Sequence, residues 1–335
     1  MAADHHGPID VLGIGSALVD VVVRATDAEL APLGLTKGSM SLVDLAGAEA
    51  LHAGVSGAVE VSGGSAANTM AALASLGGTA AFVGKVADDR LGRVFTSDIR
   101  AAGVQFDPSP APSDEALTGR CLVFVTGDAD RTMATYLGAA TTMVPGDVPV
   151  DLVARSKVVY LEGYLWDLPP AIEAMRRAIS AGHEADASVA LSLSDPFCVQ
   201  RHRREFLDLL HESLDVLFGN EEELVALFDA TSFDGALEAA EETGLLVAAT
   251  RGAKGSVVTT PHGPLALDAA PVERVVDTTG AGDLYAAGFL YGLTHGADPS
   301  GCAALGGLCA AEIIGHFGAR PEADLRALAQ AAGLL

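Results

Sequence analysis

The chain has 335 residues, of which 50% are hydrophobic and 5% aromatic, and its 20 basic and 44 acidic side chains leave a formal net charge of −24. This length suits two average domains or one large α/β domain, and a core poor in aromatic rings is built mainly from Ala, Val and Leu. The charge would repel a phosphate backbone, so it excludes nucleic acid as an expected partner.

No segment has the pattern of a targeting peptide, a membrane span or a metal-binding cysteine cluster. The N-terminus lacks a basic region and an apolar core, and glycine, serine and asparagine interrupt the uncharged stretch 61–84. The cysteines are scattered without C-x-x-C spacing and are expected to be buried free thiols: Cys121, Cys198, Cys302 and Cys309. We therefore expect a cytoplasmic protein that does not bind membranes.

The first half of the chain predicts one strand of a large sheet and several strands of a small one. Residues 9–14 are predicted to form the first strand. The segments 19–25 and 40–43 are also predicted strands, and 120–125 forms a predicted hairpin with 132–137. These strands could form a small β-lid over the C-terminal edge of the large sheet, where ligands of open α/β sheets bind and where a lid would exclude water.

Two segments match nucleotide-binding loops only in part. After Gly13-Ile-Gly15, the third glycine of the Rossmann pattern is replaced by Leu18, and a Val-rich strand follows instead of a helix. Residues 79–86 lack the first glycine and the final Ser or Thr of a P-loop. We therefore expect neither a Rossmann dehydrogenase nor a Walker-type phosphate site.

The second half alternates strands and helices. The predicted strands are residues 158–164, 189–193, 216–218, 245–250 and 256–260. The predicted helices begin after Pro170 and at 221, and others cover 204–211, 281–294, 302–317 and 323–332. This alternation predicts a parallel sheet covered by helices on both faces.

Polar and glycine-rich motifs of the first half could contact a substrate. The Asp20 carboxylate can accept hydrogen bonds from two hydroxyl groups. In Gly63-Gly64-Ser-Ala-Ala-Asn68 the glycines allow close approach, and Asn68 can both donate and accept. Arg131 follows the hairpin turn and suits bidentate phosphate contact. Structural roles alone would also explain these residues. Asp20 would be an acid beside a strand, the segment with Asn68 a capped helix start, and Arg131 part of a solvated hairpin tip.

Two motifs of the second half could contact a nucleotide or a metal ion. Asn220-Glu-Glu-Glu223 starts a predicted helix, so it reads as an N-cap with first-turn acids, and it also suits Mg²⁺ bound through water. Thr250-Arg-Gly252-Ala-Lys-Gly255 links two predicted strands. Taken alone, this second motif is a tight hairpin.

The most informative motif follows an apolar strand, where Asp277 is followed by Thr-Thr-Gly280-Ala281-Gly282-Asp283. The small residues allow backbone N–H groups to approach an anion at the start of a helix, which stabilises charge on a phosphoryl group in transfer. Asp283 could accept the proton of an attacking hydroxyl. An ordinary turn with a favourable acid in the first helical turn would also fit these residues.

Together and in this order, the motifs resemble the signatures of the ribokinase-like (PfkB) carbohydrate and nucleoside kinases, and adenosine kinases in particular. The resemblance covers nearly the whole chain. It implies a three-layer α/β/α sandwich with a mostly parallel central sheet and a small β-sheet lid. We expect the large domain to comprise residues 1–15, 46–112 and 143–335, and the discontinuous lid to comprise 16–45 and 113–142.

The resemblance implies a catalytic role for the glycine motif and for the hairpin arginine. Asp283 would be the catalytic base, Gly280, Ala281 and Gly282 would form the anion hole, and Arg131 would lie over the phosphates.

It also implies binding roles for the other motifs. Asp20 and Asn68 would hold sugar hydroxyls, with Gly63 and Gly64 beside them. ATP would contact the residues Asn220, Thr250, Gly252, Gly255 and Gly282. Mg²⁺ would be held through water by Glu223, while Asp277 and Thr279 could border a monovalent cation such as K⁺.

The expected reaction is transfer of the ATP γ-phosphoryl group to a primary hydroxyl, namely the 5′-hydroxyl of adenosine or a related nucleoside. A kinase of ribose, fructose or a keto-deoxy sugar stays open, because Asp20 and Asn68 would recognise any vicinal diol. A non-catalytic nucleotide sensor on the same fold is the other alternative, against which Asp283, Gly280 and Gly282 argue. The sequence does not reveal the oligomeric state.

Overall fold

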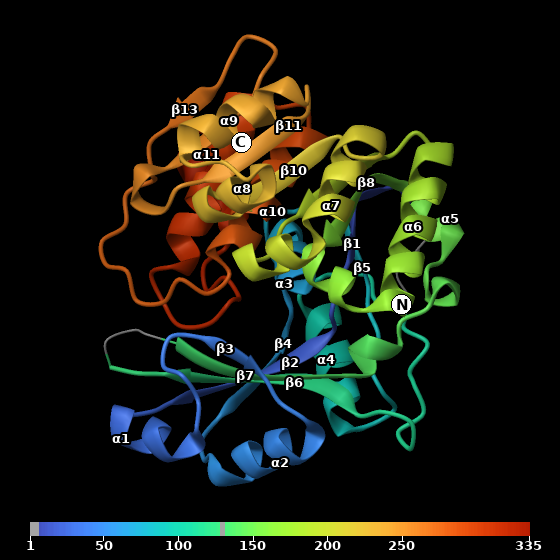
Figure 1. Ribbon diagram of the computed structural model, residues 1–335, viewed down its shortest axis with the longest axis vertical. Coiled ribbons are helices and arrows are strands. Elements are labelled where there is room, and N and C mark those ends of the chain that lie inside the picture. Colours follow the sequence, from blue (N-terminus) through green and yellow to red (C-terminus); the bar gives the residue numbers. More distant parts are fainter. Residues whose placement is uncertain (1–6, 128–130) are drawn as a thin grey trace.

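The computed structural model describes residues 7–127 and 131–335, and within them eight strands form one sheet and five form another (Figure 1). The large sheet has the order β13-β12-β11-β10-β9-β8-β1-β5. Its strands are β1 (Ile9–Ile14), β5 (Ala80–Val83), β8 (Ser156–Glu162), β9 (Ser188–Ser192), β10 (Val216–Asn220), β11 (Leu246–Thr250), β12 (Ser256–Val258) and β13 (Leu265–Leu267).

The six strands from β5 to β11 are parallel, and β12 and β13 add an antiparallel edge. The alternation of strands and helices in the second half therefore predicts the parallel part correctly. Two short strands at opposite edges, β5 and β13, were not predicted. A strand of three or four residues is too short for its side-chain pattern to be told from a loop.

Helices cover both faces of the large sheet because alternate strand residues point to opposite sides. One face packs on α3 (Ser65–Ser75), α4 (Arg90–Ala101), α10 (Ala281–Thr294), α11 (Pro299–Ile313) and α12 (Leu325–Ala331). The other packs on α5 (Val150–Val153), α6 (Pro169–Glu184), α7 (Pro196–Glu212), α8 (Glu221–Phe228) and α9 (Phe233–Glu242). The predicted three-layer arrangement is confirmed.

The helix boundaries follow their caps. Helix α10 has the predicted bounds, whereas α11 begins at Pro299 rather than at residue 302 and ends at Ile313 rather than at residue 317. The reason for the earlier start is that the Asp298 carboxylate accepts a hydrogen bond from the Gly301 N–H at 2.8 Å, which caps the helix.

The small sheet contains β2 (Leu18–Arg24), β3 (Met40–Leu42), β4 (Val59–Gly63), β6 (Thr118–Val125) and β7 (Arg131–Gly138). Their order is β3-β7-β6-β2-β4, and β6 and β7 form the predicted hairpin. Residues 128–130 of the predicted turn lie outside the described residues.

One expected boundary is wrong. Strand β4 falls in the range 46–112, which the sequence analysis assigned to the large domain, but it pairs antiparallel with β2 in the small sheet. Its sequence, Val-Glu-Val-Ser-Gly, carries polar side chains and is partly exposed, so the pattern alone did not reveal a strand. Helix α2 (Leu45–Gly54) precedes it and lies against β6 and β7. The chain thus stays with the small sheet until it enters α3.

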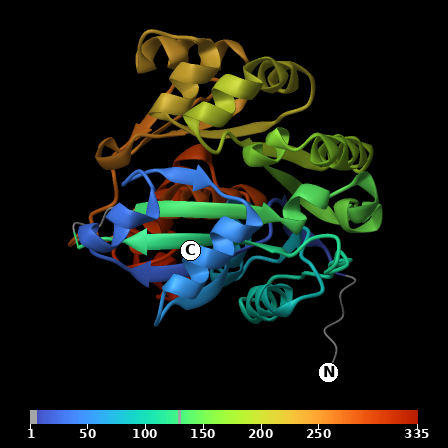
Figure 2. The same cartoon turned by 60° about the horizontal axis from the view of Figure 1, so that its bottom comes forward.

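The small sheet lies at the C-terminal edge of the large sheet. Strand β1 leads through a short turn into β2, and β4 leads through Gly64 into α3. In Figures 1 and 2 the small sheet forms a separate layer across this edge. The residues that join the two sheets therefore lie where ligands of open α/β sheets bind.

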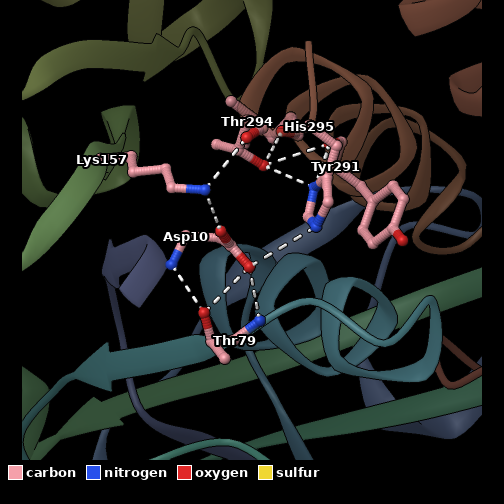
Figure 3. Close-up of polar contacts among 7 residues, drawn as sticks. Asp10, Thr79, Lys157, Tyr291, Thr294 and His295 are labelled. Carbon is pink, nitrogen blue, oxygen red and sulfur yellow. Dashed lines mark hydrogen bonds and ion pairs between the residues drawn. The ribbon is translucent and has the colours of Figure 1, made fainter. Parts of the chain in front are cut away.

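A polar network at the opposite edge fixes the far end of α10 (Figure 3). The Asp10 carboxylate accepts hydrogen bonds from Thr79 N and Oγ1 at 2.8 and 2.9 Å and from Lys157 Nζ at 2.8 Å. Lys157 also donates to the Thr294 carbonyl oxygen at 3.1 Å, and His295 Nε2 lies 4.0 Å from Asp10. Since α10 begins at the other edge with the glycine motif, this network helps to hold that motif in place.

All four cysteines are buried and unpaired by disulfides. Among residues 7–127 and 131–335, no helix is both long enough and apolar enough to cross a membrane.

Candidate active site

The first turn of α10 and the first turn of α3 converge on Asp283. Ser65 Oγ donates to Asp283 Oδ1 at 2.6 Å, and Asn68 Nδ2 donates to Oδ2 at 3.0 Å. Burial raises the pKa of Asp283, while these hydrogen bonds and the positive charges of Arg320 and Arg131 act in the opposite direction. The structure thus brings together Asn68 and Asp283, which the sequence placed far apart.

The glycines of the motif have the conformation that the turn requires. Gly280 precedes α10 in the left-handed region with φ 75°, and a Cβ there would lie 3.1 Å from the Ala319 Cβ. A side chain at this position would therefore be strained and crowded. Around Gly282, by contrast, the space that a Cβ would occupy is open, as expected for backbone that faces a ligand site.

Asp20 lies beside the turn that enters α3. A Cβ at Gly63 would overlap the Asp20 carboxylate, and a Cβ at Gly64, whose φ is 94°, would overlap the Ser16 carbonyl oxygen. Burial raises the pKa of Asp20 to about 7; Arg320 opposes this shift and the negative charge of Asp283 adds to it. Gly63 therefore makes room for the predicted substrate-binding carboxylate of Asp20, and Gly64 makes room for the backbone of Ser16.

Arg131 connects the small sheet to the glycine motif. Its Nε lies 3.0 Å from Asp277 Oδ1, and its Nη2 donates to Thr278 Oγ1 at 3.0 Å. Asp277 is buried and also accepts from Thr279 N and Oγ1 at 2.9 and 2.6 Å and from Gly318 N at 3.0 Å. Both carboxylate oxygens of Asp277 thus accept hydrogen bonds from the protein, at the place where a monovalent cation was predicted.

A cavity of about 740 Å³ adjoins the start of α10. It is large enough for a nucleotide, since ligand pockets typically span about 300–1,000 Å³. Thr250, Gly252, Gly255 and Gly282 line it, as predicted for a nucleotide site. Its apolar walls include Leu267, Val272, Val275, Ala303, Ala310 and Ile314.

Asn220 and Glu223 are engaged with each other and lie outside this cavity lining. The Asn220 N–H and Nδ2 donate to the two Glu223 carboxylate oxygens at 2.9 and 2.6 Å, and Glu223 N donates back to Asn220 Oδ1 at 2.9 Å. This is a capping box at the start of α8. Burial raises the pKa of Glu223 to about 7, and Asp195, Glu222 and Asp283 add to the shift.

Within the described part of the chain, no group of three or more His, Cys, Asp or Glu side chains is arranged to hold a metal ion.

Glu162 is a further buried carboxylate at this site that was not predicted from the sequence. This residue ends β8, is 1% exposed, and accepts hydrogen bonds from Ala66 N at 3.0 Å and from Ser16 N at 3.3 Å. Burial raises the pKa of Glu162 to about 7 against those hydrogen bonds. An acid directly after an apolar run was a usable signal, because that position places it at the ligand-binding edge of a parallel sheet.

Arg320 was also missed. It lies in the loop after α11, and its guanidinium donates to the carbonyl oxygens of Ala67 at 2.8 Å and Ser62 at 2.7 Å. Nothing in the local sequence marks this residue, because its partners lie more than 250 positions earlier in the chain.

Comparison with known proteins agrees with this geometry. A family model described as "pfkB family carbohydrate kinase" matches residues 34–325. A crystal structure of a probable sugar kinase from Rhizobium etli is 42% identical with a TM-score of 0.93, and covers 98% of this chain and 100% of that one. The adenosine kinase from Sinorhizobium meliloti is 47% identical with a TM-score of 0.91, and covers 97% and 100% of the two chains.

A 5-dehydro-2-deoxygluconokinase from Geobacillus kaustophilus is 29% identical over 70% of this chain and 72% of its own length. The two solved structures confirm the predicted fold class, a three-layer α/β/α sandwich with a mostly parallel sheet and a small β-sheet.

Proposed function

Because the chain belongs to the PfkB family of carbohydrate kinases, we propose that it transfers the γ-phosphoryl group of ATP to the 5′-hydroxyl of adenosine or a related nucleoside. The family and the relatives show that the protein is a phosphotransferase with an alcohol acceptor and a small-molecule substrate. The proposal of a nucleoside acceptor rests on the 47% identity to an adenosine kinase over 97% of the chain.

Asp283 is proposed as the general base. Its carboxylate is held by Ser65 and Asn68, and each oxygen keeps a second lone pair that can accept the acceptor's hydroxyl proton. Burial raises the pKa of Asp283 toward the working pH, which favours proton transfer. Proton removal by Asp283 makes the acceptor oxygen more nucleophilic as it attacks the phosphorus atom in line with the departing ADP.

The start of α10 would stabilise the charge that develops on the transferred group. The backbone N–H groups of Gly280, Ala281 and Gly282 stand at the helix N-terminus, which favours anions. Arg131 reaches this place from the small sheet, and we propose that it neutralises phosphate charge there. The ATP base would occupy the apolar part of the 740 Å³ cavity.

Asp20 and Asn68 are proposed to bind the acceptor's hydroxyl groups, with Gly63 and Gly64 allowing its close approach. We propose that the small sheet acts as a lid, which would exclude water and align the partners.

Mg²⁺ would be held through water by Glu223, whose buried carboxylate follows the C-terminal end of β10 and feels the charge of Asp283. When bound, Mg²⁺ neutralises charge on the phosphate oxygens. A monovalent cation at Asp277 and Thr279 stays a prediction, to be tested by comparing kcat in K⁺ with kcat in a bulky organic cation at equal ionic strength.

A sugar kinase is the second candidate, since a 5-dehydro-2-deoxygluconokinase is 29% identical over 70% of the chain. The test is phosphoryl transfer from Mg·ATP to adenosine, inosine, ribose, fructose and 5-dehydro-2-deoxygluconate in parallel, with Asp283→Asn as the control. We expect the highest kcat/KM for adenosine and a loss of about 10²–10⁴-fold in kcat for the variant. Turnover of free sugars alone would replace the nucleoside assignment, and full activity of Asp283→Asn would remove Asp283 as the base.

A further inference from the structure

Arg320 belongs to a loop that is tied to the glycine motif. This C-terminal loop (residues 314–320) accepts a hydrogen bond from Val276 N at the Ile314 carbonyl oxygen, at 2.7 Å. Gly318 N donates to Asp277 Oδ2 at 3.0 Å, and Ala319 packs against Gly280. These contacts attach the loop to the start of α10 and to the residues just before it.

From this loop the Arg320 guanidinium reaches the turn that enters α3. Nη1 donates to the Ala67 carbonyl oxygen at 2.8 Å, and Nη2 donates to the carbonyl oxygen and Oγ of Ser62 at 2.7 and 2.8 Å. Ser62 and Ala67 lie on either side of the Gly63-Gly64 turn. One planar side chain thus fixes both ends of the segment 62–68, which carries Asn68 and borders Asp20.

The surroundings of Arg320 indicate more than a packing role. Its Nε is buried and has no hydrogen-bond partner. The hydrogen bonds of the guanidinium go to neutral oxygens, while the negative charges of the Asp98, Asp20 and Asp283 carboxylates attract it. Asp98 Oδ2 also accepts from Ser62 N at 2.8 Å, which braces the same turn from α4. A buried cation costs free energy, so its placement within electrostatic reach of the Asp20 and Asp283 carboxylates calls for a function.

We propose that Arg320 is a positioning residue for phosphoryl transfer, which holds segment 62–68 against the start of α10 so that Asp20 and Asp283 face the acceptor from fixed positions. This inference rests on the proposed function, in which Asp283 is the base. The planar fork is needed because two carbonyl groups, one at the end of β4 and one in the first turn of α3, must be held at once. A lysine would offer one point charge in place of that fork.

The kinetic test compares Arg320→Lys and Arg320→Gln with Arg177→Gln, an exposed arginine of α6 that serves as the matched charge control. We expect kcat/KM for the acceptor to fall about 10–100-fold in both Arg320 variants, since a displacement of about 1 Å can cost about 100-fold. The Kd of ATP should change less than threefold. Arg177→Gln should behave as the wild type.

The pH profile separates the charge of Arg320 from its hydrogen bonds. In Arg320→Gln the acid limb of kcat/KM should move up by about one pH unit, because a positive charge near Asp20 and Asp283 is lost. In Arg320→Lys it should stay within about 0.3 unit. The other charged groups around these carboxylates are unchanged in both variants: Asp98 of α4, Arg131 of β7, Glu162 of β8 and Glu223 of α8.

Hydrogen exchange tests the positioning role without any acceptor. Amides in peptides that cover residues 62–68 should exchange at least tenfold faster in Arg320→Gln than in wild type, with the remaining peptides unchanged. Unchanged exchange there, or faster exchange with acceptor kinetics within twofold of wild type, would overturn the proposal. If the wild type phosphorylates no acceptor, the proposed function fails, and the exchange result still decides whether Arg320 holds the turn.

Discussion

The sharpest prediction concerns Gly63→Ala. An added Cβ would overlap the Asp20 carboxylate, so the carboxylate or the turn must withdraw by about 1 Å to restore ordinary contact of about 3.5 Å. Misplacement of a substrate-contacting group by about 1 Å can cost about 100-fold in rate, which corresponds to about 2.7 kcal/mol of transition-state stabilisation. We therefore expect kcat/KM for the acceptor to fall about 100-fold and the Kd of ATP to stay near the wild-type value.

The assay is a double-mutant cycle with Asp20→Ala. If the methyl group acts through Asp20, adding Gly63→Ala to Asp20→Ala should cost less than about threefold, because the displaced carboxylate is already absent. Gly54→Ala on α2 is the matched control, since a Cβ there meets no atom within 4 Å. Equal losses from Gly63→Ala in both backgrounds would refute the reasoning, as would a Gly63→Ala variant within threefold of the wild type.

Three further changes test other parts of the structure. Arg131→Gln removes the ion pair with Asp277, and we expect kcat to fall about 100-fold in a steady-state assay while ATP still binds. Burial alone would raise the pKa of Asp10, but the hydrogen bonds from Lys157 and Thr79 outweigh it and hold the pKa below 3.8. The stabilisation that these hydrogen bonds give is present above pH 3.8 and is lost as the pH falls through the folded pKa. Asp10→Asn should therefore lower the melting temperature at pH 7. Burial raises the pKa of Glu162 from 4.5 to about 7, so wild type should lose stability relative to Glu162→Gln as the pH rises from 4.5 to 7, in paired melting curves. A melting-temperature difference between wild type and Asp10→Asn that grows as the pH falls would contradict the assigned contacts. So would a wild type that gains stability relative to Glu162→Gln as the pH rises from 4.5 to 7.

The arrangement around α10 would let one helix serve both proposed substrates. Its first turn faces the 740 Å³ cavity through Gly282 and contacts segment 62–68 through Asp283. Its last turn is held at the opposite edge of the large sheet by the network around Asp10 (Figure 3). Fixing a helix at both ends limits the displacement of the groups at its start, which positioned catalysis requires.

The sequence by itself determined the chemical motifs and many of the local elements, although not β4, β5 and β13. The bounds of α10 and of β1 follow from side-chain patterns and flanking glycines, which act between near neighbours in the chain. The motif of Gly280, Gly282 and Asp283 could be recognised as a candidate anion site because it also depends only on near neighbours. Its backbone conformation and its charge are set within one turn of chain. The capping box of Asn220 and Glu223 was predictable from its spacing alone.

Only the tertiary structure decided which distant segments meet. The membership of β4 in the small sheet depends on its pairing with β2, and a partly polar strand gives no pattern that names its partner. Glu162 and Arg320 enter the site through contacts with Ala66 and Ser62, 96 and 258 positions away. Such contacts are set by how layers pack and by which buried donors need acceptors, and these conditions exist only once the chain has folded.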